Sequence, residues 1–320
     1  MTTFKGIYGT NIEVLASDPA NPIEGQIWYN TTSEKLKGYG FVVGAWATGG
    51  SLNTARRNLA GAGIQTAALA FGGGGPPATA LTESYNGTSW TELNDLNTAR
   101  RLLAGCGTNT AALAFGGFST ANVGNTESWN GTSWTELNDL NTGRNRLAGA
   151  GINTAALAFG GETTPNVLRA NNETWNGTSW TEVNDLNTAR KLLAGAGINT
   201  AALAFGGLTT VVTGVTETWN GTSWTELNDL NTARQGLGGA GTNTAALAFG
   251  GGTPTPTAAT ETWNGTSWTE LNDLNTARTE LAGTGTNTTA LAFGGEIAPN
   301  TGATEEWSGP AVQTVNITVS

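Results

Sequence analysis

One segment recurs six times along the chain, and its period constrains the fold more than any other feature. Copies of the motif L-N-T-(A/G)-R are spaced 44, 44, 46, 44 and 44 residues apart. Each copy continues through a Gly/Ala-rich run to A-L-A-F-G-G and an E-x-(W/Y) segment, followed in five copies by N-G-T-S-W-T-E. A period of about 40 to 50 residues with this much β signal is typical of a propeller with one blade per repeat. The copies begin at Leu52, Leu96, Leu140, Leu186, Leu230 and Leu274.

The second copy shows how one repeat can form four strands. Residues 103–108 carry almost no side-chain bulk, as expected for an innermost strand where blades converge. Residues 110–115 and 126–129 then predict the second and third strands, and residues 133–137 the fourth. Asn130-Gly131 between the last two strands favours a tight hairpin with a type I′ turn.

The aromatic residues predict how the first and last repeats meet. The third-strand aromatic occurs six times, but the fourth-strand tryptophan occurs only five times within the copies. Trp46 supplies the missing one, because it precedes Arg56 by ten residues, as Trp90 precedes Arg100. We therefore expect the strand around Trp46 to join the repeat that ends at Trp307. Such a connection would leave no exposed sheet edge.

These residues resemble the kelch repeat. The shared features are a hydrophobic strand ending in Gly-Gly, an aromatic residue further on, a Trp five residues later, and then Leu and Arg. The resemblance covers residues 46–307 and implies four-stranded antiparallel blades, although Trp-Asn or Tyr-Asn stands where kelch repeats carry Tyr-Asp. The prediction is an all-β, six-bladed kelch-type β-propeller at residues 45–310. A short N-terminal β-hairpin arm at residues 1–44 precedes it, and a strand or tail at residues 311–320 follows.

Composition argues against several classes of function. The net charge is −10 without a basic stretch, so nucleic acid is not an expected partner. No apolar run is long enough for membrane insertion. The chain has no His, and Cys106 fills a position held by Ala in sister repeats, so it reads as a small buried residue. Because the carboxylates recur symmetrically while an active site needs unlike environments, we expect no enzymatic activity, metal or cofactor, with a glycosidase pair as the alternative.

Six repeated arginines are the first candidates for a binding site. Each leads into an innermost strand, so symmetry predicts a ring around one mouth of the central channel. The kelch resemblance implies that arginines there bind acidic ligands. Alternatively, each arginine lies five residues after an Asp, as Arg100 follows Asp95, and these pairs would brace the loops. The repeated arginines are Arg56, Arg100, Arg144, Arg190, Arg234 and Arg278.

Two surfaces compete as the source of specificity. One is the set of residues that follow the repeated arginines and differ between repeats, namely Arg57, Arg101, Arg146, Lys191, Gln235 and Glu280. The other is the set of variable loops after Gly-Gly, which can change without disturbing the strands.

Residues 1–44 do not repeat. Gln26–Asn30 and Lys35–Lys37, joined by T-T-S-E, predict a small β-hairpin, which is marginally stable alone. We therefore expect this arm to dock on another protein through Ile27, Trp28 and Tyr29. Alternating Val and Ile residues in 309–320 predict one further strand.

The setting comes from a second resemblance. The pattern G-x-(I/L)-W-Y-(N/D)-T resembles segments of tailed-bacteriophage fibre-like virion proteins, and the near-identical repeats are similar to those of marine phages. This implies a virion protein made in the host cytoplasm without a signal peptide and present in several copies per particle. Its arm would bind other virion proteins, and its propeller a host-surface ligand, expected to be a glycan. Two alternatives stay open: a structural capsid or tail decoration protein, and a cellular kelch scaffold or glycan-active enzyme.

Overall fold

The computed structural model describes residues 12–317, which form strands and loops without a helix. The predicted all-β class is therefore confirmed for this part of the chain. None of its segments is a helix long and apolar enough to cross a bilayer. The chain divides into two compact units. We call Ala45–Ser308 the repeat unit, and residues 12–44 together with residues 309–317 the terminal unit.

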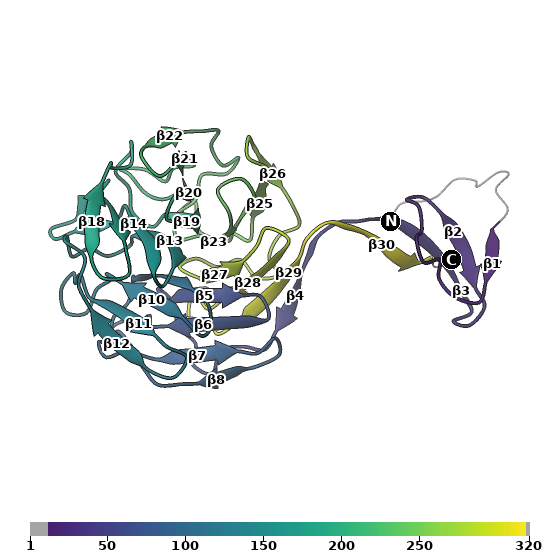
Figure 1. Ribbon diagram of the computed structural model, residues 1–320, viewed down its shortest axis with the longest axis horizontal. Helices are drawn as coiled ribbons and strands as arrows, with labels where there is room; N and C mark the ends of the chain where they lie inside the picture. Colours follow the sequence, from purple (N-terminus) through teal and green to yellow (C-terminus); the bar gives the residue numbers. More distant parts are fainter. Residues whose placement is uncertain (1–11, 318–320) are drawn as a thin grey trace. The chain divides into compact units, whose positions relative to one another are not determined.

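The repeat unit contains six four-stranded antiparallel sheets among its described strands (Figure 1). The innermost strands are β5 (Ala60–Ile64), β9 (Ala104–Gly107), β13 (Ala148–Ile152), β19 (Ala194–Ile198), β23 (Gly238–Gly241) and β27 (Ala282–Gly285). The second strands are β6 (Ala67–Phe71), β10 (Ala112–Phe115), β14 (Ala155–Phe159), β20 (Ala201–Phe205), β24 (Ala246–Phe249) and β28 (Thr289–Phe293). The third strands are β7 (Thr82–Tyr85), β11 (Thr126–Trp129), β17 (Asn172–Trp175), β21 (Thr216–Trp219), β25 (Thr260–Trp263) and β29 (Thr304–Ser308). The outermost strands are β8 (Trp90–Glu92), β12 (Trp134–Leu137), β18 (Trp180–Val183), β22 (Trp224–Glu226), β26 (Trp268–Glu270) and β4 (Ala45–Gly49).

The hairpin between the third and outermost strands forms where Asn-Gly predicts it, but with a different turn. In the second repeat Gly131 has a φ of 93°, whereas Asn130 has no positive φ, so the turn is not type I′. Instead, the Asn130 side-chain oxygen accepts hydrogen bonds from the backbone N–H groups of Thr132 and Ser133, both at 2.9 Å. Asn is thus needed here for its side-chain acceptor, and Gly for its backbone freedom.

Strand β4 completes the last sheet from the other end of the repeat unit. It pairs antiparallel with β29, and Trp46 lies opposite Trp307, as the tryptophan count predicts. The indole N–H of Trp46 donates to Thr260 Oγ1 of the preceding sheet at 3.0 Å. Trp134 of the second repeat makes the same contact with Thr82 of the first repeat, also at 3.0 Å. Trp46 is therefore equivalent to the other outermost-strand tryptophans although it precedes the first repeat.

A closed circle of backbone hydrogen bonds links the six repeats. Two residues after each repeated arginine, the chain adopts a left-handed conformation with φ between 55° and 60°. The N–H of each such residue donates to the carbonyl of its counterpart in the preceding repeat, at 2.7–3.0 Å, and the first donates to the last. We call this circle the backbone ring. Its members are Asn58, Leu102, Arg146, Leu192, Gly236 and Glu280.

Glycine is required in the innermost strands because aromatic rings of neighbouring sheets lie against them. A Cβ added at Gly105 would lie 2.4 Å from Cζ of Phe71, which belongs to the preceding repeat. That phenylalanine also contacts Trp134 edge-on, with ring centroids 4.9 Å apart and an angle of 60° between the ring planes. The bare innermost strand therefore makes room for the aromatic residues that join one sheet to the next.

The core consists of six clusters, each shared between two neighbouring sheets. The first joins Phe71 of one repeat to Trp129 and Trp134 of the next. The sixth joins Tyr85 and Trp90 of the first repeat to Phe293 of the last. Together with the backbone ring, this makes the architecture propeller-like, because every sheet packs on two neighbours.

The terminal unit is a single sheet that combines both ends of the chain. Strands β1 (Glu13–Leu15), β2 (Ile27–Asn30), β3 (Lys35–Val42) and β30 (Ala311–Asn316) lie in that order. The expected hairpin is β2–β3, and the expected C-terminal strand pairs antiparallel with β3. Asp18 accepts hydrogen bonds from Lys37, Asn30 and Trp28, which lower its pKa to about 2. The sheet is thus larger than the hairpin predicted from residues 1–44, because β1 adds a strand on one side and β30 adds one on the other.

Candidate functional site

The repeated arginines are buried and do not line a channel mouth. Each is at most 1% exposed and forms an ion pair with the glutamate of its own sheet's third strand. Arg144 lies 2.5 Å from Glu173, and Arg278 lies 2.6 Å from Glu305. The glutamate also accepts hydrogen bonds from the Asn that directly follows the Leu of L-N-T, as Glu127 does from the side-chain and backbone nitrogens of Asn97. The six pairs are Arg56–Glu83, Arg100–Glu127, Arg144–Glu173, Arg190–Glu217, Arg234–Glu261 and Arg278–Glu305.

This burial corrects the prediction that the repeated arginines bind a ligand. Removal from water lowers the pKa of Arg100, as of its counterparts from Arg144 to Arg278, while the glutamate acts in the opposite direction. The structural alternative is right in kind but names the wrong partner. Asp95 accepts a hydrogen bond from the backbone N–H of Thr82 at 3.1 Å rather than pairing with Arg100. The arginines are internal braces of each sheet.

The two surfaces that competed in the sequence form one face of the repeat unit. In repeats two to six, the residue after the repeated arginine forms a β-bridge with the first residue of the variable loop that follows Gly-Gly, as Arg101 does with Phe118 and Asn145 with Glu162. The same bridge recurs between Lys191 and Leu208. We call this side, made of the variable loops and the residues that follow the repeated arginines, the loop face. Variation in the two segments therefore changes one common surface.

Charges are unevenly distributed over the repeat unit. Its cations are either repeated arginines, each neutralised by a buried glutamate, or residues of the loop face. The loop-face cations are Arg57, Arg101, Arg146, Arg169 and Lys191. Three carboxylates accompany them, those of Glu162, Glu280 and Glu296. The exposed acidic residues of the T-E and N-D motifs lie on the outermost strands and the loops after them. The loop face is thus the positive part of an acidic protein and favours anions.

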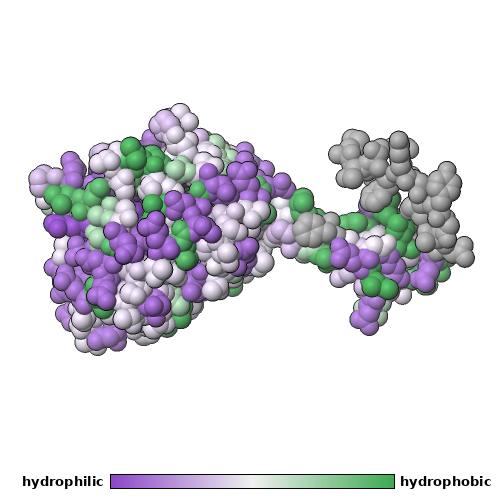
Figure 2. All heavy atoms as spheres, turned by 90° about the horizontal axis from the view of Figure 1, so that it is seen from above, coloured by the Kyte–Doolittle hydropathy of each residue, from purple (hydrophilic) through white to green (hydrophobic). Residues whose placement is uncertain are grey.

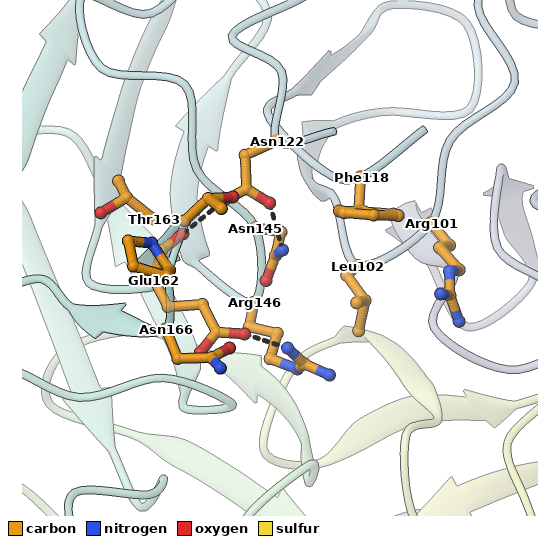
Figure 3. A pocket seen from close by; sticks show the side chains of 11 residues that line it. Arg101, Leu102, Phe118, Asn122, Asn145, Arg146, Glu162, Thr163 and Asn166 are labelled. Atoms are coloured by element: carbon orange, nitrogen blue, oxygen red, sulfur yellow. Dashed lines mark hydrogen bonds and ion pairs between the residues drawn. The ribbon is translucent and has the colours of Figure 1, made fainter. Parts of the chain in front are cut away.

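A pocket of ≈ 370 Å³ opens on the loop face between the second and third repeats (Figure 3). The second repeat contributes Arg101, Leu102, Phe118 and Asn122. The third contributes Asn145, Arg146, Glu162, Thr163, Thr164, Pro165 and Asn166. The volume lies in the range of small-molecule sites. Aromatic, amide, hydroxyl and guanidinium groups therefore line a space large enough for an organic ligand.

Three cavities on the common axis are smaller. They measure ≈ 110, 110 and 150 Å³; the first is lined by the backbone ring and the leucines that follow it, and the other two mainly by the innermost strands. Cys106 lines the last of them, is buried, and has its pKa raised to about 12 by that burial. This agrees with the prediction of a small buried residue. The pocket between repeats two and three is the larger site.

A chain of amides fixes the orientation of Asn145 in the pocket. The Asn122 side-chain nitrogen donates to the Glu162 carbonyl at 3.3 Å, so its oxygen faces Asn145. That oxygen accepts a hydrogen bond from the Asn145 side-chain nitrogen at 2.6 Å. Asn145 is only 4% exposed, and its side-chain oxygen has no hydrogen-bond partner in the described structure. This oxygen lies on the side away from Asn122 (Figure 3). A buried acceptor without a partner favours a ligand that donates a hydrogen bond.

The pocket cations differ in their partners. Glu162 pairs with both Arg146 and Lys191. Arg101 has no carboxylate partner among the described residues, and its guanidinium carbon lies 5.5 Å from the centroid of Phe118. Of the other predicted cations, Arg57 lies outside the pocket and pairs with Glu280 and Glu296. Arg101 is therefore the predicted residue with the most capacity to bind an anion.

The three arm residues predicted to dock on another protein differ in how far they are exposed on the terminal unit. Trp28 is fully buried and its indole N–H donates to Asp18, so it stabilises the terminal unit rather than docking. Ile27 is half-buried, and Tyr29 is 36% exposed. Of the three, Tyr29 is the most available for contact with another protein.

Two further observations bear on the class of site. The described residues contain no group of three His, Cys, Asp or Glu side chains arranged for a metal ion. On the face visible in Figure 2, hydrophilic and near-neutral residues cover most of the repeat unit, and hydrophobic residues form small separate patches.

In comparisons with known proteins, no protein-family model matches this chain, and no curated protein sequence matches it. The kelch and bacteriophage resemblances therefore depend on the motifs alone.

Proposed function

We propose that this protein is a non-enzymatic, fibre-like adhesin of a bacteriophage virion that binds a host-surface glycan through the loop face. The scaffold would be a six-bladed kelch-type propeller, which the backbone ring and the pairing of β4 with β29 support. The observation that carries the binding role is the pocket between repeats two and three. It joins residues that differ between otherwise similar repeats, and its amide, hydroxyl and aromatic groups are those that contact sugars.

The terminal unit would attach the protein to other virion proteins. Its small sheet includes both ends of the described chain and exposes Tyr29 and Val14. Several copies on one particle would turn weak individual sites into strong adhesion. A chain reduced to Ala45–Ser308 should keep glycan binding and fail to join particles, and its recovery on purified virions at the usual copy number would refute this attachment role.

Exchange of two loop residues tests the binding role. Phe118 and Asn122 form the same bridge as Leu208 and Val212 in the fourth repeat. The variant Phe118→Leu/Asn122→Val therefore introduces side chains that this type of loop already accepts. We expect it to fold and to lose adsorption to host cells, as measured with the purified full-length protein.

The reciprocal variant is the matched control. Leu208→Phe/Val212→Asn changes the same two loop positions in the fourth repeat, where neither residue lines the pocket, and should leave adsorption unchanged. If the first variant adsorbs as the parent protein does, the pocket is not the binding site. If the parent protein itself adsorbs to no host material while it is present on particles, the structural decoration function replaces the adhesin.

A further inference from the structure

The charge balance of the pocket indicates what kind of sugar it accepts. Arg101 and Arg146 line the pocket together with a single carboxylate, that of Glu162, which also pairs with Lys191 beside the lining. Glu162 is itself 2% exposed and bridges Arg146 and Lys191, so it is not available to Arg101. The pocket therefore has excess positive charge in a protein of net charge −10. A neutral ligand would leave this charge uncompensated, whereas an anionic ligand would neutralise it.

Arg101 is positioned to receive the anion. Its guanidinium lies beside the Phe118 ring, which restricts the side chain without consuming its N–H donors. Its backbone is held by the bridge to Phe118, with hydrogen bonds of 3.0 and 2.8 Å between the two residues. A planar guanidinium with free donors suits a carboxylate, which can accept two parallel hydrogen bonds.

The second requirement comes from Asn145 and Arg146. The free oxygen of Asn145 needs a donor, and the buried Nε of Arg146 needs an acceptor. A carboxylate or phosphate supplies acceptors only, whereas a hydroxyl group supplies both a donor and an acceptor. A ligand that satisfies the whole pocket thus combines one anionic group with hydroxyl groups.

We propose that the pocket between repeats two and three binds a carboxylate-bearing sugar residue, with Arg101 pairing with its carboxylate and Asn145 accepting a hydrogen bond from a hydroxyl. This inference rests on the proposed function and specifies its ligand. Phe118 provides an apolar surface for the C–H groups of the sugar ring. The contact to Arg101 should weaken as salt screens it.

The test uses one natural polymer in two chemical forms. Envelope polysaccharide from a host that adsorbs the protein is compared with the same polysaccharide after its carboxyl groups have been reduced to primary alcohols. This reduction removes the negative charge and keeps the other hydroxyl groups. Binding of the full-length protein is measured by biolayer interferometry at two salt concentrations. We expect the reduced polymer to bind at least about tenfold more weakly per site, as for loss of a charged hydrogen bond.

Three variants assign the roles. Arg101→Ser should lower affinity for the native polymer about tenfold and affinity for the reduced polymer little, so that the two polymers become equivalent. Asn145→Ser should weaken binding of both polymers by a similar factor, because hydroxyl groups are present in both. Arg57→Ser removes a loop-face arginine that lies outside the pocket and should change neither affinity. Thermal unfolding of each variant verifies that it is folded.

Each outcome has a distinct meaning. Equal binding of native and reduced polymer would overturn the carboxylate assignment while leaving glycan binding intact. Loss of binding after removal of phosphate esters, but not after carboxyl reduction, would also overturn it in favour of a phosphorylated sugar. Binding of neither polymer, with adsorption retained only by envelope protein, would refute glycan binding altogether.

Discussion

The repeated arginines and the residues that follow them belong to the same six loops, but their environments are opposite. Each arginine is identical, buried and paired with a buried glutamate. The next residue is Arg, Arg, Asn, Lys, Gln or Thr, and it is held in each of repeats two to six through a backbone bridge to a variable loop. Where a side chain supplies a contact that nothing else can replace, the repeats agree. Where the main chain supplies the contact, the side chains differ between repeats, and they form the loop face.

The largest expected effect on stability comes from removing one of the buried Arg–Glu ion pairs. Arg234→Met leaves Glu261 charged and buried without its partner at 2.8 Å. Breaking such a pair typically costs about 3–5 kcal/mol. Chemical denaturation should show this loss in the free energy of unfolding.

The adjacent residue provides the control for that experiment. Gln235→Ala alters the loop face one position further on and should change stability by less than about 0.5 kcal/mol. Similar losses for the two variants would contradict the division into brace and loop face.

A second experiment asks whether β4 is a full member of the scaffold. Trp46→Ala removes a tryptophan that packs on Phe249 and Trp307, with ring centroids 5.0 and 5.3 Å apart. The expected loss is about 3 kcal/mol. Trp134→Ala, at the equivalent position in the second repeat, should lose the same amount, and a much smaller loss for Trp46→Ala would show that β4 is dispensable.

The smallest expected effect is a gain, at a position where one repeat departs from the pattern of the others. Outermost-strand tryptophans donate to a threonine of the preceding sheet, as Trp268 does to Thr216 at 3.0 Å. Asn172 stands in that threonine's place opposite Trp224, and neither the indole N–H of Trp224 nor the Asn172 side-chain oxygen has a partner. Asn172→Thr should restore the hydrogen bond and raise stability by about 1 kcal/mol.

Differential scanning calorimetry measures this change directly. The reverse substitution in a regular repeat, Thr216→Asn, should lower the melting temperature by a comparable amount. No gain from Asn172→Thr would mean that the missing hydrogen bond is not what distinguishes this position.

Much of the scaffold could be predicted because its signals are local and repeated. The Gly/Ala run, the A-L-A-F-G-G strand and the Asn-Gly hairpin lie where their residue types require, and counting tryptophans placed Trp46 opposite Trp307. Each of these signals depends on short sequence spacing or on symmetry.

The arginine partner and the pocket could not be predicted in the same way. Glu127 is 27 residues from Arg100 and becomes its neighbour only after the third strand has paired with the second. Asp95 is closer to Arg100 in the sequence, at five residues, but its carboxylate accepts a hydrogen bond from the backbone N–H of Thr82 instead. Likewise, Asn122 and Asn145 meet because one repeat packs on the next, and the terminal sheet forms because β30 returns to β3.

The backbone ring has a consequence for how this protein can evolve. Its six hydrogen bonds join main-chain atoms only, so the register between repeats does not depend on which side chain stands at each ring position. Those positions hold Asn, Leu, Arg, Leu, Gly and Glu, and none is β-branched, the type that tolerates a positive φ least. Mutation there can exchange charge, size and polarity around the centre of the loop face while the framework stays unchanged. For the adhesin proposed above, this would allow the binding surface to follow a host that alters its own surface, one substitution at a time.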